Sequence, residues 1–389
     1  MIWDIAWKNF YRQGIRSFLN VLVTALTLVT VVFNISLYNG FQSQATRNMV
    51  RTDVAGGQYR VSGFDILTPT DWEDLTLRIP ESLKRLPPSQ KAEVLLQQGQ
   101  IFPNRRLFPI QLRGIDMRQK LLDLPLEALA SRPAAVGETI PVVLGNKMAA
   151  RSHLRRGDTV VLRWRDKNGV VDARDVTVVD VVPLVNPRID EGILWMRLDH
   201  LRALTLRPEE VTWVTVKKFQ GPVGGLEFHP PDDLMADILN LIESDRRYAK
   251  ILWVILVFLA GISVFNTQIL NVFKRQKEIG TLMALGMTPR QVIALFTLEG
   301  SLAAFFSVFA ALILGAILFS WFQSVGLDIS HLRESNIPVR ENILLDIHPV
   351  EVVYSAVVIV GIMVLVAWAP VRKISRLDPT LALRGRGIT

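Results

Sequence analysis

The hydrophobic pattern of this chain is dominated by four apolar stretches, each long enough to cross a bilayer as a helix. About 20 apolar residues, at a rise of about 1.5 Å per residue, span a hydrocarbon core of about 30 Å. The third stretch is longer than this, which predicts a tilted helix or one that extends beyond the bilayer. The pattern therefore predicts four transmembrane helices, at residues 18–38, 250–273, 291–323 and 350–370.

A polar segment, residues 39–249, separates the first two apolar stretches and is long enough to bury its own core. Runs such as "QYRVSG", "AEVLLQQGQ" and "DTVVLRW" are typical of strands, whereas "VLGNKMAARSHL" is typical of a helix. The predicted fold class is a membrane protein with four transmembrane α-helices and a large α+β domain inserted between the first and second helices. Because neither Gly nor Pro occurs after Pro231 and before Ala260, we expect one continuous helical rod into the second span.

The net charge of +8 arises from three short segments rich in Lys and Arg, residues 1–17, 274–290 and 371–389. By the positive-inside rule these segments are cytoplasmic, which places both termini inside. Residues 39–249 and the loop at residues 324–349 are then extracytoplasmic. The excess of basic residues thus orients the chain across the membrane and places positive charge next to anionic lipid headgroups. No basic face with interleaved aromatic residues is found, so we expect no nucleic-acid partner.

Residues 1–17 hold aromatic side chains at positions i, i+4, i+7 and i+8, with Lys8 and Arg12 beside them. This spacing predicts an amphipathic cytoplasmic-face helix that lies on membrane lipids, and an ordinary helix start is the alternative. The aromatic residues are Trp3, Trp7, Phe10 and Tyr11.

Small residues recur at about four-residue spacing in the third apolar stretch, a pattern that lets a second helix approach closely in lipid. The predicted transmembrane packing face comprises Gly300, Ala303, Ser307, Ala311 and Gly315. Glu299 is the acid nearest to membrane depth. It is either a functional group or a carboxyl that hydrogen-bonds to neighbouring helices.

The signatures of common catalytic and metal sites are absent from the sequence. Without Cys there is no disulfide, thiolate ligand or thiol nucleophile, and the five His residues lack zinc-site spacing. No G-x-S-x-G motif occurs, and the "GNK" string at Gly145 lacks the rest of a P-loop. We therefore expect no catalytic residue, metal or cofactor on this chain.

Residues 274–290 form a charged segment between two apolar stretches. It combines a basic start with a short apolar ridge, which predicts a small amphipathic helix that docks into a groove on a cytoplasmic partner. Gly286 is placed to end this helix, and Thr288 and Pro289 to cap and begin the next. The ridge comprises Ile279, Leu282, Met283 and Leu285.

The stretch "RQKEIGTLMALGMTPRQV" closely resembles the signature of FtsX-like ABC transporter permeases, the type VII superfamily of MacB, LolC, LolE and FtsX. Glu299 and Gly300 fall where the third span of that family carries its Glu. The tail "ISRLDPTLALRGR" is similar to the family's ending, and "VVLGNKMAARSHLRRGDTVVL" is similar to its extracytoplasmic core motif. The resemblance therefore covers the whole chain.

The resemblance implies a non-catalytic permease subunit of the bacterial inner membrane. Two permease chains, as a homodimer or a heterodimer, would work with separate ABC ATPase subunits that bind ATP and Mg. Closure of the ATPases would move the outer domains by mechanotransmission. The ATPase-coupling residues would be Arg275, Lys277, Glu278, Ile279, Gly280, Leu282, Leu285, Gly286 and Pro289.

Three functions are compatible with the resemblance. A LolC/LolE-like permease would act on a lipoprotein or another amphiphile at the outer face of the membrane. A MacB-like efflux permease would work with a periplasmic adaptor, and an FtsX-like transducer would activate a cell-wall hydrolase. The LolC/LolE-like permease is the leading interpretation and the MacB-like permease its competitor. The polar segment of about 210 residues is longer than the outer domain usual for an FtsX-like transducer, which makes that function less favoured.

An amphiphile taken from the outer leaflet requires an apolar cavity near the outer ends of the first two spans. Candidate lining residues on the first span lie at four-residue spacing, and those on the second lie in its outer half. Simple contact with lipid is the alternative, because periodicity alone does not separate the two. The candidates are Val29, Phe33, Leu37, Trp253, Leu256 and Phe258.

The charge asymmetry generates a topology prediction. A Cys introduced at Asn168 should react with a membrane-impermeant thiol reagent in intact spheroplasts, because residues 39–249 are expected outside. The chain has no Cys of its own, so the labelled site is unambiguous. Protection of this Cys until the cells are lysed would place the domain in the cytoplasm instead.

Overall fold

The computed structural model describes residues 2–12, 14–64, 75–130, 139–184, 186–328 and 342–374. The chain divides into two compact units, each with its own hydrophobic core. A helical unit comprises Met1–Phe41, Ile242–Asp328 and Asn342–Thr389. An α+β unit comprises Gln42–Leu241 and Ile329–Glu341. Residues 375–389, which hold the predicted "DPTLALR" ending, lie outside the described residues, as do residues 329–341 of the predicted outer loop.

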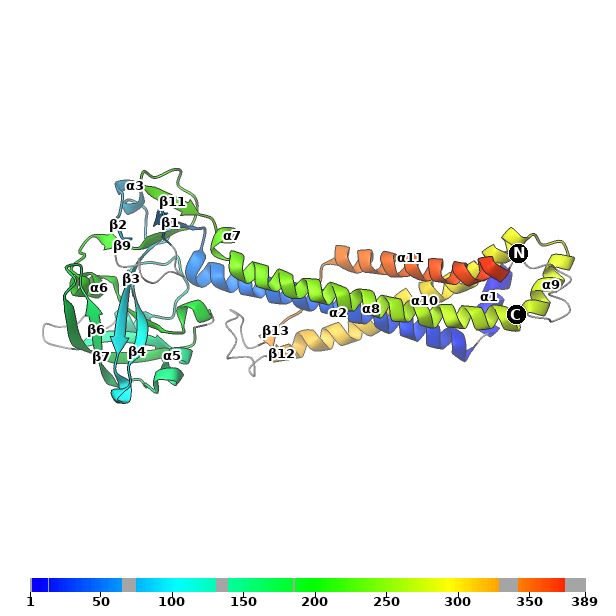
Figure 1. Cartoon of the computed structure of the whole chain (residues 1–389), viewed down its shortest axis with the longest axis horizontal. Helices are drawn as coiled ribbons and strands as arrows, with labels where there is room; N and C mark the ends of the chain where they lie inside the picture. Colours follow the sequence, from blue (N-terminus) through cyan, green and yellow to red (C-terminus); the bar gives the residue numbers. More distant parts are fainter. Residues whose placement is uncertain are drawn as a thin grey trace. The chain divides into compact units, whose positions relative to one another are not determined.

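Four long helices run alongside one another in the helical unit (Figure 1). They are long and apolar enough to cross a membrane, at Ser17–Val54, Ala236–Lys274, Pro289–Val325 and Pro349–Ala369, which confirms the expected four helices of spanning length. The helices that form the unit are α1 Ile2–Arg12, α2 Ile15–Met49, α8 Ala236–Lys274, α9 Gln276–Ala284, α10 Pro289–Val325 and α11 Pro349–Ile374. The short strands β12 Leu327–Asp328 and β13 Asn342–Ile343 pair after α10.

The first helix, α1, packs on α10 through part of its aromatic face. The Phe10 ring stacks on that of Phe306 at a centroid distance of 5.2 Å, and Trp7 approaches the same ring at 5.6 Å. Trp3 and Tyr11 remain exposed, and Trp7 stays partly exposed beside its contact. The four aromatic residues therefore divide between an intrachain contact and an exposed surface, rather than sharing one surface-facing side.

The expected rod begins later than the sequence suggested. Pro231–Leu234 forms the one-turn helix α7, and Met235 leaves helical geometry at φ −108° and ψ 1°. The helix then continues without interruption from Ala236 to Lys274, a run of 39 residues. Burial of Met235 beside Met49 and Val54 accounts for the local break, because its side chain anchors the turn.

The α+β unit is built on a nine-stranded sheet in the order β11-β1-β10-β3-β4-β8-β5-β7-β6 (Figure 1). Strand β6 also pairs with β3 at Gly99 to Ile101. The six strands β3, β4, β8, β5, β7 and β6 therefore close into a barrel. The strands are β1 Gln58–Val61, β2 Leu77–Arg78, β3 Lys91–Ile101, β4 Phe108–Ile115, β5 Ile140–Gly145, β6 Thr159–Arg165, β7 Val171–Val182, β8 Ile193–Arg197, β9 Glu210–Val211, β10 Trp213–Val216 and β11 Leu226–His229.

Helices in the α+β unit are short. They are α3 Glu81–Lys84, α4 Glu127–Ala130, α5 Asn146–Ser152, α6 Leu198–Thr205 and α7 Pro231–Leu234. The alternating sequence runs fall on strands β1, β3 and β6, and "VLGNKMAARSHL" spans the end of β5 and the whole of α5. The expected α+β class is therefore confirmed.

A partly buried ionic cluster around Glu210 ties together three segments of the α+β unit. Its carboxylate accepts hydrogen bonds from Lys167, from Thr76 at 2.6 Å and from Arg207 at 2.9 Å. Burial alone raises the pKa of a carboxyl group, but these donors outweigh it and lower the pKa of Glu210 from 4.5 to about 2. The folded state therefore favours the ionised carboxylate.

This pKa predicts how stability depends on pH. The contribution of Glu210 should be fully present above about pH 5 and be lost as the pH falls towards 2, because the unfolded chain binds the proton first. At about 1.4 kcal/mol per pKa unit, it amounts to at most about 3 kcal/mol. The difference in unfolding free energy between the full-length protein and Glu210→Gln should shrink over this range in denaturant titrations. Glu209→Gln, at the exposed neighbouring position, is the control; a pH-independent difference for Glu210→Gln would contradict the prediction.

Candidate functional site

Helix α9 forms a separate short element between two spanning helices, as its sequence predicts. Arg275 leaves helical geometry at φ −104° after α8 ends, and Gly286 takes φ +100°, which favours glycine. Thr288 then caps α10 in a capping box, since its backbone N–H donates to Gln291 Oε1 at 2.8 Å and its hydroxyl accepts from Gln291 N–H. Pro289 occupies the first turn of α10. The predicted helix end and start are confirmed.

Most of the apolar ridge of α9 packs inside the chain. Ile279 is 3% exposed and packs with Met283 against Val272, Val292 and Phe296. Leu282 packs beside Ala6 and Leu295, and Gly280 is buried. The inward residues of α9 therefore anchor it to α1, α8 and α10, with Ile279 and Gly280 buried and Leu282 and Met283 half-buried.

The outward face of α9 is different in character. Leu285, the remaining ridge residue, directly follows the last residue of α9 and is 80% exposed. Lys277, Glu278, Thr281 and Ala284 are exposed on the same helix. This outer face, which we call the α9 surface, combines two charges with one large apolar side chain. It is the part of α9 that another protein would meet.

An ion pair holds the start of α9 against α10. The Arg275 guanidinium lies 3.1 and 3.3 Å from the two oxygens of Glu299, and it donates to Glu278 at 2.6 Å. It also lies 4.9 Å from the centroid of the Phe296 ring. Glu299 is only 3% exposed. Of the two interpretations of Glu299, the structure favours the carboxyl bound to neighbouring segments. Local spacing did not identify Arg275 as its partner, because the two residues are 24 positions apart.

The small residues of α10 lie where other helices approach. A Cβ on Gly300 would lie 2.5 Å from the Cβ of Ala367 on α11, and one on Gly315 would lie 3.9 Å from Val29 on α2. Ser307 and Ala311 are buried between these points, and Ala303 is half-buried. The small-residue face therefore lies against helices of the same chain.

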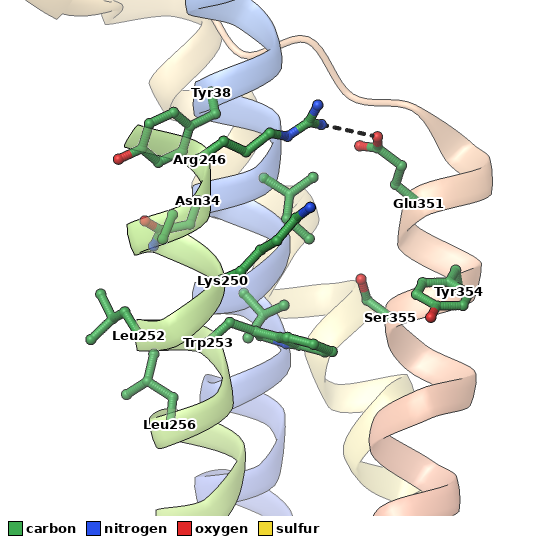
Figure 2. Close-up of a pocket in the computed structure, with 13 residues that line it drawn as sticks. Asn34, Tyr38, Arg246, Lys250, Leu252, Trp253, Leu256, Glu351, Tyr354 and Ser355 are labelled. Atoms are coloured by element: carbon green, nitrogen blue, oxygen red, sulfur yellow. Dashed lines mark ion pairs between the residues drawn. The ribbon is translucent and has the colours of Figure 1, made fainter. Parts of the chain in front are cut away.

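A cavity of about 390 Å³ lies among α2, α8 and α11 (Figure 2). This volume is within the range of small-molecule sites, about 300–1,000 Å³. Apolar and aromatic side chains dominate its lining, with Val31 and Ile35 from α2 and Trp253 and Leu256 from α8. This cavity of the helical unit therefore has room for a ligand.

Two of the six residues proposed from the sequence line this cavity, Trp253 and Leu256. Val29 is buried in the core of the helical unit, and the Phe33 ring packs against Phe322 at a centroid distance of 5.1 Å. Phe258 is 67% exposed, and Leu37 is half-buried without lining the cavity. The lining face of α2 is thus rotated from the predicted one. It includes the polar residue Asn34.

Polar side chains from three helices meet at one end of the cavity. Arg246 of α8 donates to Asn39 of α2 at 2.6 Å, and Asn39 donates to Glu351 of α11 at 2.5 Å. Arg246 and Glu351 lie 3.6 Å apart (Figure 2). This network, which we call the three-helix clamp, joins α2, α8 and α11. Local sequence patterns do not reveal this network, because its members are more than 100 residues apart.

No group of three or more His, Asp or Glu side chains that could hold a metal ion occurs in the described ranges. The features of the helical unit that could contact another molecule are the cavity and the α9 surface. Neither arrangement supplies a nucleophile paired with a base.

Comparison with known proteins gives a consistent set of relatives. Residues 250–379 match the model of the FtsX-like permease C-terminal family. The chain is 21% identical over 406 residues to the lipoprotein-releasing system transmembrane protein LolC of Neisseria meningitidis serogroup B, covering 96% of this chain and 95% of the relative. It is also 21% identical over 344 residues to LolC of Xylella fastidiosa, covering 80% and 78%.

Among solved structures, the periplasmic region of MacB from Actinobacillus actinomycetemcomitans is similar to part of the chain. The match has 13% sequence identity and a TM-score of 0.31, and it covers 50% of this chain and 96% of that structure.

The ion pair at α9 generates a stability prediction. Glu299→Gln should lower the free energy of unfolding by about 2 kcal/mol or more, because Arg275 loses its buried counterion. Glu278→Gln should cost less than about 1 kcal/mol, because Glu278 is exposed. Thermal unfolding of the purified full-length protein in detergent measures both. Equal losses in the two variants would show that the buried contact has no special weight.

Proposed function

Because this chain is a member of the FtsX-like permease family, whose members are permease components of ABC transporters, we propose that it is the permease subunit of a complex acting on a lipoprotein or another amphiphile. The observation that carries the proposal is the α9 surface. Helix α9 is short and anchored to α8 and α10, and this surface is its exposed face. In this proposal α9 rests on a separate ABC ATPase, which binds ATP and Mg.

The contacts of α9 suit the transfer of force. A push on α9 reaches α10 through the Arg275 to Glu299 ion pair and the packing around Ile279. It reaches α8 through the single residue that joins the two helices. Helix α8 is about 58 Å long, at about 1.5 Å for each of its 39 residues, and its first residues belong to the α+β unit. A continuous helix of this length supports mechanotransmission.

The amphiphile part of the proposal is supported by the names of the relatives and by the cavity. Both LolC proteins are described as parts of a lipoprotein-releasing system, and one of them aligns over nearly all of this chain. A cavity with an apolar wall and a polar end suits a molecule with the same two parts. We therefore favour a substrate of the outer leaflet over a soluble one.

The proposed orientation follows from the charge pattern. Both termini and α9 face the cytoplasm of a bacterial inner membrane, and the α+β unit lies outside. A second permease chain, identical or related, completes the complex.

Disruption of the α9 surface should separate the chain from its ATPase. Leu285→Glu should reduce the amount of ATPase that co-purifies by about tenfold, because it places a charge at the exposed apolar position of the surface. Glu278→Lys should act in the same direction, since it reverses one of the surface charges. The measurement is quantitative mass spectrometry of the complex, together with ATP hydrolysis by the co-purified ATPase.

Leu107→Glu is the matched control. It makes the same change at an exposed leucine of the α+β unit, and it should leave co-purification unchanged. Normal ATPase recovery and normal ATP hydrolysis with both α9 variants would remove the assignment of α9 as the coupling helix.

A further inference from the structure

The cavity wall changes in character along α8. Six residues of this helix line the cavity, and four of them fall at spacings of three or four, which places them along one face: Arg246, Lys250, Trp253 and Leu256. Ala249 and Leu252 line it beside them. The two cations come first, and the aromatic and aliphatic side chains follow. Figure 2 shows Arg246, Lys250 and Trp253 extending from the same side of α8. The wall is therefore charged at one end and apolar at the other.

The change from charged to apolar coincides with the start of the spanning segment. The apolar run of α8 begins at Ile251, directly after Lys250. Cationic side chains at such a boundary lie at the level of lipid headgroups, and a Trp one turn further in lies just below them. A lipid molecule in the adjoining leaflet has the same order of groups, with a polar head above apolar chains.

The two cations of the cavity differ in their partners. Arg246 is engaged in the three-helix clamp with Asn39 and Glu351. Lys250 is exposed and forms no hydrogen bond or ion pair with any residue that the structure describes. The charged end of the cavity thus holds two positive charges and one carboxylate, which leaves one positive charge without a counterion.

A second group on the wall also lacks a partner. The indole N–H of Trp253 is buried and has no acceptor among the described residues. Buried N–H groups are nearly always paired with an acceptor, either in the protein or in something bound to it. An oxygen of a bound molecule would satisfy this donor with a small movement of the ring.

We propose that the cavity binds an anionic phospholipid from the surrounding membrane, with its phosphate at Lys250 and an acyl chain along Trp253 and Leu256. The inference rests on the proposed function, which places the cavity at the outer leaflet, and it adds the chemical class of the ligand. A zwitterionic phospholipid brings no net charge to Lys250. An uncharged lipid anchor of a protein brings no phosphate.

Trp253 provides a reporter inside the site. The full-length protein in nanodiscs of phosphatidylcholine would be titrated with phosphatidylglycerol that carries brominated acyl chains, which quench tryptophan at close range. Subtracting the signal of Trp253→Phe isolates this residue from the other eight tryptophans. Quenching of Trp253 should reach half its maximum at a lower mole fraction of brominated phosphatidylglycerol than of brominated phosphatidylcholine.

Lys250→Gln should raise that half-saturating mole fraction of phosphatidylglycerol about fivefold and leave the value for phosphatidylcholine unchanged. Lys250→Arg should retain the preference. Arg247→Gln is the matched control, because Arg247 is adjacent on α8 and exposed, bonds to Ser244 and does not line the cavity. Its removal should have no such effect on Trp253.

Three results would overturn the inference. Equal quenching by the two lipids would remove the preference for an anionic headgroup. An equal effect of Arg247→Gln would reduce Lys250 to a general interfacial charge. Relief of quenching by free glycerol phosphate would show that phosphate alone binds. None of them bears on the α9 surface, so ATPase co-purification with Leu285→Glu tests the proposed function independently.

Discussion

The ion pair between Arg275 and Glu299 determines the geometry of the end of the helical unit that holds α9. A carboxylate enclosed by apolar helices is costly unless a cation and hydrogen-bond donors compensate it. Glu299 lies two to three turns into α10 and is almost fully buried, so α10 retains its charge only with Arg275 close by. Arg275 is the single residue between α8 and α9. The buried charge on α10 therefore holds the junction between α8 and α9 against α10.

A related constraint operates at the cavity. In the three-helix clamp a guanidinium, an amide and a carboxylate bind one another, so that each polar group has a partner. These contacts join α2, α8 and α11. Lys250, one turn along α8 from Arg246, has no such partner among the described residues. The contrast separates a cation that holds helices together from one that is available to a ligand.

Local pattern was sufficient for much of the fold. Length and hydropathy identified the four spanning helices, and Gly286 and Thr288 marked a helix end and start by their own conformational preferences. The face of α2 that lines the cavity was not predictable from the sequence. This helix is apolar on nearly every side, so a four-residue spacing fits several faces equally. The face through Val31 and Ile35 lines the cavity instead of the face through Val29.

Long-range contacts were beyond such patterns. Closure of the barrel depends on β6 meeting β3, and the start of α8 depends on burial of Met235 against residues far earlier in the chain. The predicted apolar ridge of α9 was correct in composition, but the chain's own helices cover Ile279, Leu282 and Met283. Amphipathic spacing identifies an apolar face that packs against something. It does not say whether the packing partner is the same chain or another protein.

Helix α8 links the cavity to α9, the two parts of the helical unit for which we propose a function. Its lining face from Arg246 to Leu256 forms a wall of the cavity, and its last residue is joined through Arg275 to α9. No Pro interrupts it, and the only glycine within it, Gly261, has just one neighbouring atom within reach, on Val366. A helix without a kink moves as one body, because bending it would break backbone hydrogen bonds that lipid cannot replace. A shift of α9 that is passed to α8 must therefore move the cavity wall. The three-helix clamp at Arg246, towards the other end of α8, opposes sliding of α8 against α2 and α11.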